Sequence, residues 1–263
     1  MNAQLVAVSQ NIAFLGDSRA KPFDGRVVAI DGMSENPVVT VSRWISFLRA
    51  SWLYDGTRVA PRIARALWEM RFLEAEERGH PAFGTVRLHT VVDGERDFAL
   101  LPRCSNRHLV VACGQVDALD LERDFYGVYW LDLDMPADYV PVVEPYRAPT
   151  QLGEAVVYER FRRTFEPLFA MLDLLADSGV GRLHLMGLAR PRPNGYPTAD
   201  LRQRLTLLAN RVYRDECAKR GIDYIDAWAL YATAGGTRDE RYFREDHYAA
   251  EAVPLMVARV LGA

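Results

Sequence analysis

The sequence has few cysteines and no dominant sign of charge. Its 263 residues include only 3 cysteines, Cys104, Cys113 and Cys217, which are widely spaced and form no CxxC pair. This spacing argues against a disulfide framework and a cysteine-based metal site, and reduced thiols fit it best. The 32 basic and 35 acidic side chains give a formal net charge of −3, so nothing draws the chain to nucleic acid or to an anionic membrane. We expect a small or neutral partner.

Long hydrophobic runs, repeats and linkers are also lacking. The first residues, Met1 to Val6, have no basic region or long apolar run, and no later segment has the ~18 apolar residues that span a bilayer. We therefore expect a soluble, cytoplasmic protein. Its 5 histidines show no HxH or HExxH spacing, so no metal or other cofactor is predicted. Without a linker or an internal repeat, one domain over residues 1–263 is the simplest interpretation.

The chain does contain short β-branched runs that alternate with longer segments of helical period. This alternation is typical of an α/β fold, in which crossover helices join parallel strands. Three helices are predicted, over residues 157–175 with a kink at Pro167, over residues 198–220 with a left-handed end at Gly221, and over residues 249–260. Five strands are predicted, over residues 12–15, 26–30, 109–113, 182–187 and 222–225.

Residues 37–107 fit this alternation less well. Helical stretches are predicted around Trp44 to Trp52 and from Pro61 to Glu77, and a hairpin is predicted around the turn dipeptide Asp93-Gly94. We interpret the segment as an insertion in the same domain. Its tryptophans are expected to pack in the core; a lid over a crevice and a homodimer face are the alternatives.

Chemically useful residues directly follow several predicted strands. Gly16-Asp17-Ser18 follows the first strand, Gly32 the second, Gly114 the third, and residues 191–194 the fourth. Ligands of open parallel sheets bind outside the carboxyl ends of the strands. A serine there becomes a nucleophile when a base lies within hydrogen-bond reach and donors face the oxyanion. His247, ahead of the last predicted helix, is the candidate base.

In this order the residues resemble the SGNH or GDSL hydrolases, a family of esterases, lipases and carbohydrate deacetylases. The resemblance covers nearly the whole chain and implies a flavodoxin-like, three-layer α/β/α sandwich with a mostly parallel five-stranded sheet. It further implies that Ser18 is the nucleophile, that its N–H and that of Gly32 bind the oxyanion, that Gly114 opens the third block, and that His247 is the base.

The third block departs from the family pattern. The family has Gly-x-Asn-Asp, and this chain has Gly114-Gln115-Val116-Asp117. Val116 therefore stands where the family has an asparagine that donates to the oxyanion, and losing one such donor costs roughly 3 kcal/mol of barrier. Gln115 is the candidate substitute.

The Asp-x-x-His block departs as well. Arg244 replaces the aspartate three residues before His247, and a guanidinium cannot accept the imidazole N–H. Glu245 and Asp246 are the neighbouring carboxylates that could orient the histidine, and a backbone carbonyl is the third option.

Other polar residues have plainer interpretations. Asp17 and Asp117 are predicted to accept hydrogen bonds from loop amides rather than to transfer protons. His184, inside a predicted strand, is interpreted as a core histidine. Arg190 and Arg192, which alternate with Pro191 and Pro193, either present guanidinium forks to a carboxylate or phosphate or belong to a solvated, stiff loop.

Taken together, the residues and the resemblance predict a serine esterase. Its substrate would be an O-acyl ester, O-acetyl among the candidates, of a carbohydrate or small metabolite, and the substrate class rests on the resemblance alone. The departures leave two alternatives: a catalytically impaired protein that binds a sugar or acyl metabolite, and an acyltransferase that uses the same serine.

Overall fold

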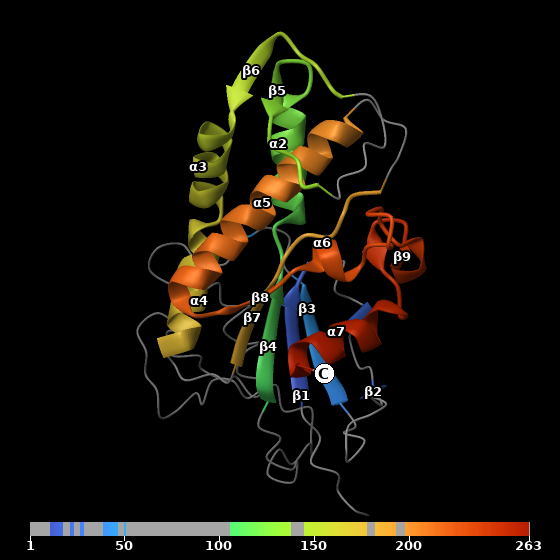
Figure 1. Cartoon of the computed structure of the whole chain (residues 1–263). Coiled ribbons are helices and arrows are strands. Elements are labelled where there is room, and N and C mark those ends of the chain that lie inside the picture. Colours follow the sequence, from blue (N-terminus) through green and yellow to red (C-terminus); the bar gives the residue numbers. More distant parts are fainter. Residues whose placement is uncertain are drawn as a thin grey trace, which may run out of the picture.

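The structure, a computed structural model, describes residues 11–17, 22–23, 27–28, 39–46, 50, 106–137, 145–177, 182–192 and 198–262 (Figure 1). The elements are β1 (Asn11–Gly16), β2 (Val27–Val28), β3 (Val39–Ser46), β4 (Asn106–Ala112), α2 (Gln115–Phe125), β5 (Tyr129–Asp132), β6 (Thr150–Gly153), α3 (Glu154–Thr164), α4 (Glu166–Asp177), β7 (Arg182–Met186), α5 (Ala199–Arg220), β8 (Asp223–Ile225), α6 (Ala227–Leu230), β9 (Phe243–Arg244), β10 (His247–Tyr248) and α7 (Ala252–Leu261).

The main sheet has the strand order β2-β3-β1-β4-β7-β8. Strands β3, β1, β4, β7 and β8 pair in parallel, whereas β2 runs antiparallel to β3 at the edge. Numbered along the chain, the parallel strands have the order 2-1-3-4-5, which is the flavodoxin-like order of doubly wound folds. The predicted fold class is confirmed. The sheet differs from the predicted one in having a sixth strand, β3.

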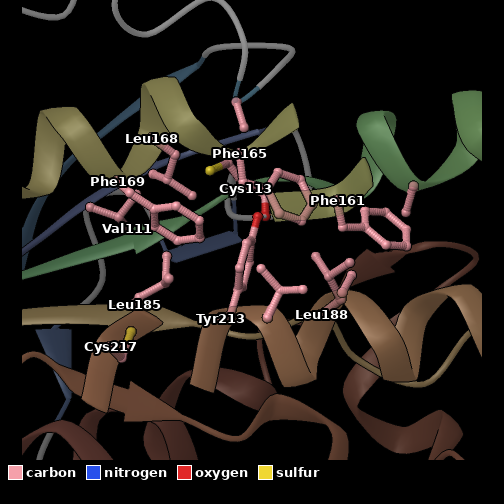
Figure 2. Packing of buried hydrophobic residues seen from close by; sticks show 14 of the residues in the cluster. Val111, Cys113, Phe161, Phe165, Leu168, Phe169, Leu185, Leu188, Tyr213 and Cys217 are labelled. Atoms are coloured by element: carbon pink, nitrogen blue, oxygen red, sulfur yellow. Dashed lines mark hydrogen bonds between the residues drawn. The ribbon is translucent and has the colours of Figure 1, made fainter. Parts of the chain in front are cut away.

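Helices cover both faces of this sheet. Side chains of a strand alternate between its faces, and β4 shows this alternation directly. Leu109 and Val111 are buried against α2, α3, α4 and α5, whereas Val110 is buried with α6 and α7 on the other side. Figure 2 shows the first of these cores, in which Val111 and Leu185 of the sheet meet Phe165 and other side chains of the helices. The layers are therefore α/β/α.

Strand β3 corrects the prediction made for its residues. Residues 39–46 form a strand beside β1, in which Trp44 pairs with Phe14 and Ile45 with Leu15, so the helix predicted around Trp44 is wrong here. A short apolar run does not distinguish a buried strand from a helix by its period, and pairing with β1 decides the outcome. The helix from residue 61 and the hairpin at Asp93-Gly94 lie outside the described residues and stay predictions.

The helix predicted over residues 157–175 is interrupted. It forms α3 and α4, which are separated at Phe165, and Pro167 lies in the first turn of α4. Proline has no N–H to donate to the preceding turn, and its ring crowds the carbonyl four residues earlier. The predicted kink is therefore a complete break between two helices.

The other two predicted helices are confirmed. Helix α5 ends at Gly221, which is left-handed with φ 65°, and α7 covers most of the third predicted range. Thr198 occupies the N-cap position of α5, but its side chain makes no capping bond. Asp200, in the first turn of α5, accepts hydrogen bonds from the Tyr146 N–H at 3.1 Å and from Arg204 Nε at 2.9 Å.

Candidate active site

A pocket lies at the carboxyl ends of β1, β4 and β7. It is partly open to solvent and is narrow, with a cavity volume of about 20 Å³. Asp17 lines it directly after β1, Cys113 directly after β4, and residues 186–189 at the end of β7. Gln115 of α2 and Tyr248 of β10 complete the wall. This is the edge at which doubly wound sheets bind ligands, beside the β1/β4 boundary where the strand order reverses.

Asp17 continues the pairing of β1 with β4 by one residue. Its side chain is buried, and its N–H donates to the Ala112 carbonyl at 3.1 Å. The next residue in the chain, Ser18, lies outside the described residues, so its role as the nucleophile stays a prediction. The backbone that leads to Ser18 nevertheless enters the pocket.

The direction of β2 bears on the prediction for Gly32. That prediction assumed that β2 runs parallel to β1, so that Gly32 would follow its carboxyl end into the crevice. Strand β2 is antiparallel, and its last residue, Val28, pairs with Val39 at the beginning of β3. Strand β2 therefore ends at the amino ends of the parallel strands, whereas the pocket lies at their carboxyl ends. Gly32 lies outside the described residues. Its role as an oxyanion donor stays a prediction, but the direction of β2 no longer supports it.

The third block forms a sharp turn into a helix. Gly114 is left-handed with φ 98°, and α2 begins at Gln115. The Gln115 side chain is buried at the pocket, and its Oε1 has no hydrogen-bond partner among the described residues. Val116 is half-buried in the first turn of α2. Asp117 accepts a hydrogen bond from the Ala50 N–H at 3.0 Å, which is the kind of structural role predicted for it.

Cys113 is a second potential nucleophile in the pocket wall, but its thiol is not activated. Burial raises the pKa of Cys113 well above its ordinary value, and the Asp117 and Asp17 carboxylates raise it further. The thiolate is the reactive form of cysteine, so this thiol stays protonated and inert at neutral pH.

His247 lies on a short hairpin. Strands β9 and β10 pair antiparallel, with His247 opposite Arg244 and Tyr248 opposite Phe243. Successive strand residues point to opposite sides. Accordingly, Tyr248 is buried and lines the pocket, whereas His247 is exposed.

The turn of this hairpin is held by Arg238. The Arg238 guanidinium is only 3% exposed, lies 4.1 Å from the centre of the Phe243 ring, and donates to the Glu245 carbonyl. Its Nη1 also lies 3.8 Å from Asp246 Oδ1. Glu245 itself adopts a left-handed conformation with φ 54°. Arg238 therefore binds the backbone carbonyl of Glu245 and pairs with the carboxylate of Asp246, contacts that sequence reasoning missed.

Arg244 is exposed and is paired with a nearby carboxylate. Its guanidinium donates to Glu251 Oε1 at 3.1 Å and to the carbonyl of the preceding residue, Phe243. The position that carries an acid in the family pattern thus holds a cation with a carboxylate partner of its own.

Two further residues singled out in the sequence, His184 and Arg190, have structural roles. His184 is 1% exposed and is hydrogen-bonded to His108, so the predicted core histidine is confirmed. Arg190 is buried over the Trp228 ring at 4.5 Å and donates to the Trp228 carbonyl at 3.3 Å. The solvated loop predicted for Arg190 and Arg192 is wrong for Arg190, because its buried guanidinium connects the segment after β7 to α6 through Trp228. Arg192 is exposed.

Within the described residues, no group of three or more His, Cys, Asp or Glu side chains is arranged to hold a metal ion. None of the helices in this part of the chain combines the length and apolar character needed to cross a bilayer.

No family model and no curated protein matches the chain. Solved structures of esterases and lipases do resemble it at low identity. An acetyl xylan esterase from Geobacillus stearothermophilus is 12% identical with a TM-score of 0.47, over 96% of this chain and 94% of the other. A GDSL-like lipase from Bacteroides thetaiotaomicron is 12% identical with a TM-score of 0.43, over 99% and 90%. An aryl esterase from M. smegmatis is 12% identical with a TM-score of 0.43, over 97% and 98%. Such likeness concerns the fold alone.

Proposed function

We propose that the chain is an SGNH-type ester hydrolase in which Ser18 attacks an ester carbonyl and His247 is its base. The observation that supports this most is that the chain neighbours of both residues, Asp17 and Tyr248, line one pocket. Consecutive Cα atoms are about 3.8 Å apart, so backbone positions for both residues beside this pocket are compatible with the described chain. The His247 side chain, which is exposed on the other side of β10 from Tyr248, has to turn toward the pocket to reach Ser18.

The proposed reaction has two halves. His247 takes the hydroxyl proton as Ser18 bonds to the carbonyl carbon, and it returns that proton to the leaving alcohol as the acyl-enzyme forms. Water then attacks the acyl-enzyme with His247 again as the base. The Ser18 N–H and the Gln115 amide would bind the oxyanion. Gln115 is favoured because its buried side chain lines the pocket and its amide group carries two N–H donors.

A neutral acyl group suits this pocket best. Met186, Leu188 and Ala189 make one wall apolar, and Asp17 is the charged side chain among the described lining residues. A carboxylate disfavours an anionic acyl group beside it. We therefore propose a short, uncharged acyl ester, with acetyl as the first candidate. A carbohydrate or small-metabolite alcohol is proposed on the motif resemblance alone.

Covalent labelling tests the nucleophile. A fluorophosphonate should label the wild-type protein on Ser18, and Ser18→Ala should abolish both labelling and hydrolysis of p-nitrophenyl acetate. Ser178→Ala, which removes the serine after α4, is the matched control and should label fully. Equal labelling of Ser18→Ala and wild type would overturn the assignment.

A binding protein without turnover is the second candidate. It is favoured by the cation at position 244, which is bound to Glu251, and by the outward position of His247 relative to Tyr248. Calorimetry with acetylated monosaccharides separates the two. Heat of saturable binding with no released acetate would favour the binding protein, whereas acetate release that Ser18→Ala abolishes would favour the hydrolase.

A further inference from the structure

Helix α5 directs two polar side chains at the backbone of the pocket. Asn210 and Tyr213 are three residues apart and so share one face of the helix. Both are buried, at 3% and 0% exposure. Helix α5 is buried along much of its surface, and its apolar core side chains include Leu205, Leu208 and Val212. Polar groups in such a place need specific partners.

Asn210 binds the segment that leaves β7. Its Oδ1 accepts from the Leu188 N–H at 2.6 Å, and its Nδ2 donates to the Leu188 carbonyl at 2.8 Å. One amide thus satisfies both backbone groups of Leu188, as a neighbouring strand would. Leu188 lines the pocket between Gly187 and Ala189. This wall of the pocket is therefore attached to α5.

Tyr213 binds the segment that leaves β4. Its hydroxyl donates to the Cys113 carbonyl at 3.0 Å, and Figure 2 shows the side chain reaching from α5 to Cys113. The hydroxyl also occupies the space that a Cβ at Gly114 would need. Gln115 follows immediately and lines the pocket. The turn that presents the Gln115 amide is thereby fixed from α5.

We infer that Asn210 and Tyr213 are positioning residues of the acyl-transfer site. Tyr213 acts through the Gln115 amide, and Asn210 acts through the Leu188 wall that faces the acyl group. The inference rests on the proposed function. A displacement of about 1 Å at a reacting group can cost roughly 10²-fold in rate, and one rigid helix that holds two strand ends keeps their separation constant.

Removing one oxygen tests the role of Tyr213. Tyr213→Phe should lower kcat on p-nitrophenyl acetate about tenfold with KM within twofold, because an oxyanion donor acts in the transition state. Tyr158→Phe is the matched control, since the Tyr158 hydroxyl donates to Asp215 of α5 at 2.8 Å without lining the pocket. It should keep wild-type kcat. An unchanged kcat in Tyr213→Phe, or an equal loss in both variants, would overturn the inference.

A double-mutant cycle tests the route through Gln115. In a Gln115→Ala background, Tyr213→Phe should lower kcat less than twofold, because the amide that it positions is already gone. A full tenfold loss in that background would show that Tyr213 acts elsewhere and would overturn the route.

Asn210→Asp tests the wall. It keeps the acceptor for the Leu188 N–H and loses the donor to the Leu188 carbonyl, so the wall should shift. The ratio of kcat/KM for butyryl and acetyl esters should change at least fivefold, whereas Tyr213→Phe should leave it within twofold. An unchanged ratio in Asn210→Asp would overturn its role. If the wild-type protein shows no Ser18-dependent hydrolysis, the proposed function is refuted. The positioning roles of Asn210 and Tyr213, which rest on that function, are then refuted as well.

Discussion

His108 Nδ1 lies 3.0 Å from His184 Nε2, across the pair of strands β4 and β7. Only one proton fits between two nitrogens at that distance. Burial, and to a smaller extent His108, lowers the pKa of His184 to about 4, while the Asp223 carboxylate, 3.6 Å from His184 Nδ1, opposes the shift. The pair makes this part of the core sensitive to acid.

We expect the free energy of unfolding to fall as the pH falls from about 6.5 to 4. Above pH 6.5 His184 is neutral in both states. Below pH 6.5 the His184 imidazole takes up a proton in the unfolded chain but stays neutral in the folded chain. The free energy of unfolding therefore falls by roughly 2 to 3 kcal/mol. Urea unfolding between pH 7.5 and 4.5 measures it. His184→Gln should flatten the dependence, and an identical slope in both proteins would contradict this account.

Gly114→Ala should destabilise the protein by about 3 kcal/mol. The residue has φ 98°, where a Cβ is strained, and the added methyl group would overlap the Tyr213 hydroxyl. Gly127→Ala is the control, because Gly127 also has a positive φ, 78°, but nothing lies within 4 Å of its added Cβ. It should cost about 1 kcal/mol. Equal losses in thermal or urea unfolding would show that Tyr213 does not limit this position.

Neither buried thiol should react in the native protein. Burial raises the pKa of Cys217 to about 12, and that of Cys113 is raised for the same reason. Iodoacetamide at pH 7.5, followed by peptide mass spectrometry, should modify both only after denaturation. Cys113→Ser should keep hydrolysis within threefold. Rapid native alkylation of Cys113 with loss of activity would instead make it the nucleophile.

Arg238→Met should loosen the turn before His247. The variant keeps an apolar stem on Phe243 but loses the bond to the Glu245 carbonyl and the charge over the ring, at a cost of about 2 kcal/mol. It should also lower kcat roughly tenfold. Arg241→Met is the control, because Arg241 is 76% exposed and pairs with Asp239. That variant should stay within about 0.5 kcal/mol of wild type.

Local patterns accounted for much of the fold. The ends of α5, the break at Pro167 and the α/β alternation depend on short-range rules: helical period, a left-handed glycine, and a residue without an N–H. Strand β3 did not follow such rules, because Val39 to Ser46 acquires its identity by pairing with β1. Helix α2 was not predicted either, since the residues after Gly114 were interpreted only as a motif.

The polar residues show the same division. Asp117 was expected to bind a loop amide because aspartate does so near its own backbone, but its partner, Ala50, is 67 residues away. Asn210 and Tyr213 gave no distinctive local signal, because α5 also buries other polar side chains such as Gln203 and Thr206. Nothing local says that their partners are Leu188 and Cys113.

The amino-acid sequence by itself determined the class of fold and the order of the candidate residues, because periodicity and turn chemistry depend on neighbouring residues and motif order depends only on position along the chain. Only the tertiary structure decided which strand lies beside β1, that Asp17, Gln115 and Tyr248 line one pocket, and that α5 holds its walls. Those relationships join residues far apart in the chain, and their energies come from burial and pairing that exist only after the layers have packed.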